Sequence, residues 1–336
     1  MSFVSNTLLD TLQSAIMVLG ILVTFRILGI ADMTVEGSFP LGAAVTSKLL
    51  VAPHGTDPLL ATMAGVAVGC LAGFATGLCF SRLGLNVVVA GILVGTAAYS
   101  VQLEILGAPD VSLYGHRTVF DLFSAVAPVT TDIWLEIGVL AGILAFCAVA
   151  LYVVLRTDFG LALRSLGDNT AMLRGTGVRT ERVVVTGLVA SNGLVGLSGS
   201  LVAQTAAFSS VSFGTSELIA AVASLVVGLA LIGTRKLVRL VVAAGLVGPL
   251  VYEGILNGIL RTGFSNTSFD LISSTIVAAA VSAPYLRRQL SDGRQLRLMR
   301  SWFGPGAHGS GGTAIVVPAA NRPQTKKREV SQWKSD

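Results

Sequence analysis

Histidine and cysteine are scarce in this chain, which has three of each among 336 residues. None of them forms a C-x-x-C pair or a Cys/His spacing that could hold zinc, and the histidines lie in separate polar segments. The sequence therefore predicts no metal site, no disulfide framework and no cofactor. The six positions are His54, His116, His308, Cys70, Cys79 and Cys147.

Charge is also scarce, since only 12% of the residues are charged, against about 25% in an ordinary soluble domain. The chain is 53% hydrophobic and its mean hydropathy is +0.77. Both values predict a polytopic membrane protein surrounded by lipid. The net charge of +5 does not indicate nucleic-acid binding, because the basic residues lie in short loops and a tail, where the positive-inside rule explains them.

Two catalytic motifs are missing or incomplete. No lysine follows a glycine, so the chain has no G-x-x-x-x-G-K-[ST] loop to hold the phosphates of ATP. Gly196–Gly199 reads GLSG, as in rhomboid-type intramembrane proteases, but no histidine occurs in any apolar run to serve as the base of the serine. We therefore expect a subunit that is not an enzyme; if it uses ATP, a partner hydrolyses it.

Nine runs of predominantly apolar residues are present, each a candidate membrane span. They predict an all-α fold with about 8 to 10 transmembrane helices. The first run lacks a basic leader and a small-residue cleavage site, so we interpret it as a retained helix. The runs are 8–28, 37–52, 58–80, 84–106, 133–155, 183–205, 217–233, 238–260 and 270–286. The second and seventh are short and are candidates for broken or re-entrant helices.

The basic residues predict the orientation of these spans. If every run crosses, most lysines and arginines fall on one side, which is then the cytoplasm, with the amino terminus outside and the carboxyl terminus inside. Lys48 and Arg261 are exceptions on the outer side. The cytoplasmic groups are Arg26, Arg82, the 156–182 loop, Arg235, Lys236, Arg239 and the tail from Arg287.

Two short segments resemble each other. GSFPLGAAVTS at 37–47 aligns with GTSELIAAVAS at 214–224, with Gly, Leu, Ala, Ala, Val and Ser in register. An odd number of span positions separates the two segments, so they would enter the membrane from opposite faces as an inverted repeat, which is common in transporters. Chance similarity between alanine-rich helices is the alternative.

Glycines recur every fourth residue at Gly65, Gly69, Gly73 and Gly77. This spacing predicts a smooth helix face against which another backbone packs closely. Gly91 with Gly95, and Gly138 with Gly142, repeat the pattern over one turn.

Acids at membrane depth are the candidates for a translocation path, since an ionised side chain there must face protein or water. Glu36 and Glu217 each begin a repeat segment. A helix start in the interfacial region is the alternative, because acids also complement the helix dipole. The predicted path residues are Asp32, Thr34, Glu36, Ser38, Thr215 and Glu217. Asn192, Gln204, Asn86 and Gln102 are candidates for hydrogen bonds between helices or for lining a channel.

The longest polar interruption, 156–182, carries five arginines and three acids. Its sequence GLALRSLGDN (160–169), followed by Ala171, Met172 and GTGV (175–178), resembles the cytoplasmic signature G-x-A-x-R-A-x-G-x-N-x-x-A-A-x-x-x-G-I of permease subunits in ABC importers of the branched-chain amino acid and ribose type. Ser165, Leu173 and Val178 depart from that pattern. IADMTVEGSFPLG at 30–42 is similar to the amino-acid-type subgroup, in which D-L-T-V-[DE]-G-S-F precedes a G-A segment.

The resemblance implies a permease domain at 1–286 and leaves 287–336 as a basic tail of disordered composition. It also implies a bacterial cytoplasmic (inner) membrane location, two ABC ATPase subunits, an extracytoplasmic solute-binding protein received by loops 104–132 and 208–217, and a second permease chain. The solute would be an amino acid, with sugars and nucleosides open.

In such permeases the 156–182 segment forms a short helix parallel to the membrane that docks in a groove of the ATPase. A charged connector without that role is the alternative for this segment. An ion-coupled secondary transporter using Glu36 and Glu217 is the alternative for the chain, and a scaffold or receptor a third class. The predicted coupling residues are Gly160, Arg164, Gly167, Asp168, Asn169 and Gly177.

Overall fold

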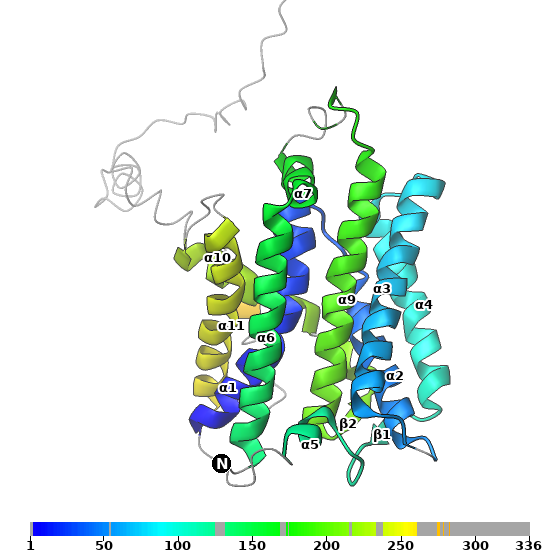
Figure 1. Ribbon diagram of the computed structural model, residues 1–336, viewed down its shortest axis with the longest axis vertical. Coiled ribbons are helices and arrows are strands. Elements are labelled where there is room, and N and C mark those ends of the chain that lie inside the picture. Colours follow the sequence, from blue (N-terminus) through cyan, green and yellow to red (C-terminus); the bar gives the residue numbers. More distant parts are fainter. Residues whose placement is uncertain are drawn as a thin grey trace, which may run out of the picture. The chain divides into compact units, whose positions relative to one another are not determined.

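The computed structural model describes residues 3–53, 55–124, 132–168, 175–214, 217–232 and 238–260, with a few isolated positions besides. Helices make up nearly all of this part of the chain (Figure 1). The elements are α1 (Phe3–Ile21), the π-helix η1 (Leu22–Leu28), α2 (Val35–Val51), α3 (Pro58–Leu83), α4 (Val87–Leu106), β1 (Asp110–Ser112), α5 (Val119–Ser124), α6 (Asp132–Arg156), α7 (Asp158–Asp168), α9 (Thr180–Ala206), β2 (Phe208–Ser210), the 3-10 turn η2 (Val211–Gly214), α10 (Glu217–Ile232) and α11 (Val238–Leu260).

Seven helices in the described residues are long and apolar enough to cross a membrane. They correspond to seven of the nine predicted runs, and the all-α polytopic class is confirmed. The second run forms α2, which has 17 residues and is too short to count among the seven. The ninth run, 270–286, the tail 287–336 and the Arg235 and Lys236 pair lie outside the described residues, apart from isolated positions.

Helical structure is interrupted between η1 and α2. Gly29 ends η1 in a left-handed conformation, with φ of 68°, which glycine adopts without a steric penalty. The non-helical residues that follow lead to α2, and Asp32 among them contacts Asn192, the 13th of the 27 residues in α9. The start of α2 therefore lies near mid-depth of the bundle.

Contacts between helices give their directions. α2 runs parallel to α9, since Ser38 bonds Asn192 and Thr46 bonds Ser200. α1 runs antiparallel to both α9 and α11, and α10 runs antiparallel to α11, with Gly228 against Ala244. α2 and α10 therefore run in opposite directions, as the inverted-repeat hypothesis requires.

The glycine stripe of α3 packs against α9, as predicted. A Cβ atom on Gly65, Gly69 or Gly73 would overlap backbone or side-chain atoms of α9, so the two backbones lie in direct contact. Gly91 and Gly95 likewise admit the backbone of the 33–37 segment. Gly138 and Gly142 in α6 differ, because no atom of the described chain lies within 4 Å of their Cβ positions. Within the described part of the chain, their spacing serves no close helix packing.

A two-stranded antiparallel sheet, which the sequence did not predict, joins the loop after α4 to the loop after α9. Asp110 pairs with Ser210, and Ser112 with Phe208. Lys48 lies at the same end of the bundle, where its Nζ donates to the carbonyl of Leu106 at the end of α4. A lysine at a helix carboxyl terminus is stabilising, which explains this exception to the charge pattern. We call the end of the bundle that carries this sheet the β end, and the opposite end the α7 end.

Candidate functional site

Three of the predicted path residues form a buried hydrogen-bond network with α9 and α3. Asp32 is fully buried, and its carboxylate accepts from the backbone N–H of Thr34 (2.9 Å) and from Nδ2 of Asn192 (2.7 Å). Asn192 Oδ1 accepts in turn from Ser38 Oγ at 2.6 Å. The Thr34 and Thr76 hydroxyls are 2.7 Å apart. Asp32, Thr34 and Ser38 therefore fix the start of α2 in place, and none of them lines the pocket described next.

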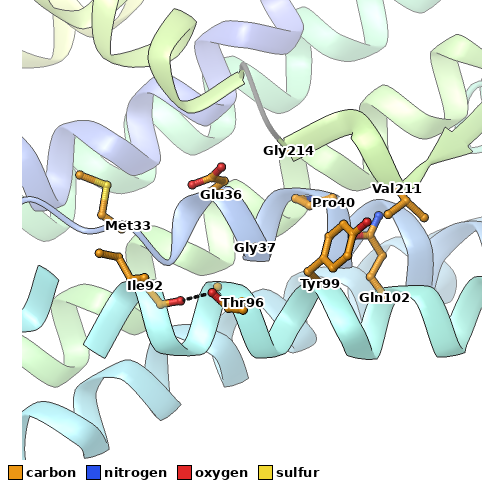
Figure 2. Close-up of a pocket in the computed structure, with 11 residues that line it drawn as sticks. Met33, Glu36, Gly37, Pro40, Ile92, Thr96, Tyr99, Gln102, Val211 and Gly214 are labelled. Carbon is orange, nitrogen blue, oxygen red and sulfur yellow. Dashed lines mark hydrogen bonds between the residues drawn. The ribbon is translucent and has the colours of Figure 1, made fainter. Parts of the chain in front are cut away.

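Glu36 is exposed and lines a pocket of about 240 Å³ between α2, α4 and η2 (Figure 2). The walls include Thr96, Tyr99 and Gln102 from α4, and Gly214 from η2. Gly214 is required there because a Cβ atom would overlap the Glu36 carbonyl and approach the Pro40 ring. No basic side chain lies among the described residues that line the pocket.

Glu217 lines a different pocket, of about 250 Å³, between α1, α2, α9, α10 and α11. Two further acids line it: Asp10, which accepts from Asn257 Nδ2 (3.1 Å), and Glu253, which accepts from Ser14 Oγ (2.8 Å). Both residues are acids inside apolar runs of the sequence, and a search for such acids would have identified them as candidates. Thr215, the remaining predicted path residue, lies outside the described residues.

The other predicted polar residues have structural partners. Gln204 contacts Thr62 Oγ1 (2.9 Å) and the Val119 N–H (2.8 Å), which ties α9 to α3 and α5. Asn86 does not join helices, because its Oδ1 caps the start of α4 at the Val88 N–H. The serine of the GLSG sequence, Ser198, donates to the carbonyl of Gln13 at 3.0 Å and so serves helix packing.

The 158–168 part of the predicted coupling segment forms α7, an amphipathic helix of 11 residues. Figure 1 shows it nearly end-on above α6, across the direction of the long helices. Leu163 and Leu166 are buried toward the bundle, whereas Phe159 and Leu161 are 38% and 55% exposed. A helix of this kind presents an apolar surface away from the bundle it lies on.

Two of the predicted coupling glycines are sites of close approach. Gly160 lies against the backbone of Val154 and Leu155, and Gly167 against the Ile27 carbonyl of η1, so that neither has room for a Cβ atom. Gly177 has φ of 80° and turns the chain, as predicted for a glycine that reverses its direction.

Arg164, predicted to face a partner, is half-buried and its Nε donates to the Gly160 carbonyl at 3.3 Å. Of the two remaining predicted coupling residues, Asp168 ends α7, with a side chain outside the described part, and Asn169 lies outside it altogether.

Pockets between membrane-spanning helices, beside an interrupted helix, are typical of transporters, so fold and pockets together indicate a membrane transport protein. Which transport family it is follows from residues 3–281, which match the family described as branched-chain amino acid transport system / permease component. The chain belongs to that family of ABC transporter permeases, and it is a multi-pass membrane protein.

Three relatives are similar to this chain over most of its length. The chain is 30% identical over 291 residues to the tyrosine transport system permease protein of Clostridioides difficile (strain R20291), covering 86% of this chain and 94% of that one. It is 28% identical to the uncharacterized protein RP368 of Rickettsia prowazekii, over 83% and 98% of the two chains. It is 24% identical to the galactofuranose transporter permease protein YtfT of Escherichia coli K12, over 73% and 69%. No solved structure matches the chain.

Proposed function

We propose that this chain is the membrane-spanning subunit of an ATP-driven importer for an amino acid. It would work as a pair of permease chains in a bacterial inner membrane, with two cytoplasmic ATPases and an external solute-binding protein. The chain itself performs no chemistry and provides the path. Tyrosine is the first solute to test, because the Clostridioides relative, 30% identical, is described as a tyrosine permease.

The observation that carries this proposal is α7. It lies across the bundle end with Phe159 and Leu161 exposed, which is the surface an ATPase groove would cover. The arginines support a cytoplasmic α7 end, since all the described ones except Arg117 lie at that end. They are Arg26, Arg82, Arg156, Arg164, Arg179, Arg182 and Arg239.

The β end would then face outward and receive the binding protein. The β1–β2 sheet joins the two loops predicted for that contact, 104–132 and 208–217, into one surface. Tyr114, 89% exposed, lies in that surface two residues after β1. A sheet holds both loops in a fixed relative position, which favours recognition by a rigid partner.

The exposed carboxylate of Glu36 supports a path along the α2–α4 face. Glu36 lies beside Gly37, which contacts Gly95, the ninth of the 20 residues of α4. An ionised side chain facing lipid at this depth costs about 2.5–3.5 kcal/mol. We infer that this face meets water or the second permease chain. Glu36 and Glu217 line separate pockets, so no arrangement of the two acids favours the ion-coupled alternative.

The energy source for uptake distinguishes an ATP-driven importer from an ion-coupled secondary transporter. In cells that express the chain with its native partners, uptake of radiolabelled tyrosine is expected to stop when arsenate depletes ATP. It should continue when a protonophore dissipates the proton gradient while glycolysis maintains ATP. Uptake that follows the ion gradient and ignores ATP would contradict the importer.

A further inference from the structure

The charged and hydrogen-bonding groups that line the pocket beside Glu36 restrict which ligands it can bind. Its polar groups come from Glu36, Thr96, Tyr99 and Gln102, and no basic side chain lies among the described lining residues. The Thr96 hydroxyl already donates to the Ile92 carbonyl, so its oxygen is left to accept. A pocket with one carboxylate and several acceptors favours a ligand with a positive charge and hydrogen-bond donors over an anion.

Gln102 provides a second, independent observation at this pocket. Its side chain is fully buried, and its Nε2 donates to the Ser210 carbonyl at 3.3 Å. Its Oε1 has no hydrogen-bond partner. Buried acceptors are rarely left unpaired, and an unpaired one is stabilised by any donor that a ligand brings to it.

The pocket is elongated along α4. Gly37, the neighbour of Glu36, lies against Gly95, which is seven residues before Gln102, so the two ends are about 10 Å apart along the helix. Tyr99 lies between them, with its ring half-exposed at the pocket wall (Figure 2). An aromatic ring in that position can stack on another ring and attract an ammonium group.

We propose that this pocket is a solute subsite for an amino acid with a hydroxylated aromatic side chain. The Glu36 carboxylate binds the ammonium group, the Tyr99 ring packs on the aromatic ring, and Gln102 Oε1 accepts from the hydroxyl at the far end. Rotation of Tyr99, which is half-exposed, gives the ligand access to Gln102. The proposal rests on the proposed function, and it adds that the permease itself, besides the binding protein, selects the solute.

Direct binding to the permease–ATPase complex in nanodiscs, without binding protein, tests the subsite. The probes are L-tyrosine, L-phenylalanine, which lacks the hydroxyl, and 3-(4-hydroxyphenyl)propionate, which lacks the ammonium group. Wild type is expected to bind tyrosine most tightly. Glu36→Gln should raise the Kd for tyrosine about tenfold, because one charge-assisted contact is lost. It should lower the Kd for the propionate, because the repulsion between its carboxylate and that of Glu36 is removed. Gln102→Leu should make tyrosine and phenylalanine bind equally.

Glu104→Gln is the matched control, since Glu104 is an exposed acid of α4 that lies outside the pocket, and this variant should bind all three probes as wild type does. ATPase activity of each complex verifies assembly. The inference is overturned if wild type shows no saturable tyrosine binding, or if Glu36→Gln binds tyrosine as tightly as wild type. An intact complex with ATP-dependent uptake and no such binding would refute only the subsite, whereas absence of an ATPase partner would refute the importer itself.

Discussion

Gly69→Leu is expected to prevent accumulation of the folded protein in the membrane. A Cβ atom at Gly69 would overlap the Asn192 carbonyl of α9 and lie 3.1 Å from Gly196 Cα, so the added side chain has no space. Both obstacles are backbone atoms of a helix buried at the centre of the bundle, and neither can rotate away. Overpacking typically costs about 1–3 kcal/mol, and a side chain that meets backbone with no room to relax lies at the upper end of that range. Fluorescence-detected size-exclusion chromatography in mild detergent should show loss of the monodisperse peak.

Gly138→Leu is the matched control for this change. It introduces the same side chain into a glycine pair of the same spacing, but nothing in the described chain lies within 4 Å of its Cβ position. The elution profile and thermal stability should stay close to those of wild type. Equal behaviour of the two variants, in either direction, would contradict the close packing of α3 on α9.

Gly167→Leu is expected to separate ATP hydrolysis from transport. Gly167 of α7 lies against the Ile27 carbonyl in η1, and Gly29, which ends η1, leads into the segment that places Asp32 and Glu36. A leucine there pushes α7 away from η1 without crossing the bundle, because α7 lies at its surface. In proteoliposomes, ATPase activity should stay within about twofold of wild type while tyrosine uptake falls about tenfold, a change of about 1.4 kcal/mol.

Gly175→Leu serves as the control in the same segment, because its Cβ position contacts nothing within 4 Å of the described chain. It should retain the wild-type ratio of tyrosine transported to ATP hydrolysed. If Gly167→Leu also retains that ratio, the contact between α7 and η1 does not carry the coupling.

Membrane spans and the α7 segment could be predicted from the sequence because their signals are local. Apolar runs report burial in lipid directly, and two glycines of α7, Gly160 and Gly167, mark close approaches of the backbone. Whether a glycine pair packs against another helix depends on residues far away in the sequence. Gly65–Gly77 pack on α9, whereas no described residue packs on Gly138, although the spacings are identical. The three-residue strands are too short to leave a pattern.

The roles of the acids within the membrane spans were harder to predict, because their partners are also distant in the sequence. Asp32 and Glu36 are four residues apart, yet Asp32 is held by Asn192, 160 residues away, while Glu36 faces a pocket. Sequence proximity grouped them as one path. Asp10 and Glu253, 243 positions apart, meet beside Glu217 only in the folded chain.

Copurification of an ATPase with this chain tests the central claim most directly. The tagged permease is solubilised in mild detergent from cells expressing its partners, and ATPase activity in the eluate is compared among wild type, Leu161→Glu and Tyr114→Glu. Leu161 is exposed on α7, whereas Tyr114 is exposed at the β end. Wild type and Tyr114→Glu should retain the ATPase, and Leu161→Glu should lose most of it. A permease that purifies without ATPase activity, or equal retention by all three proteins, would contradict docking on α7.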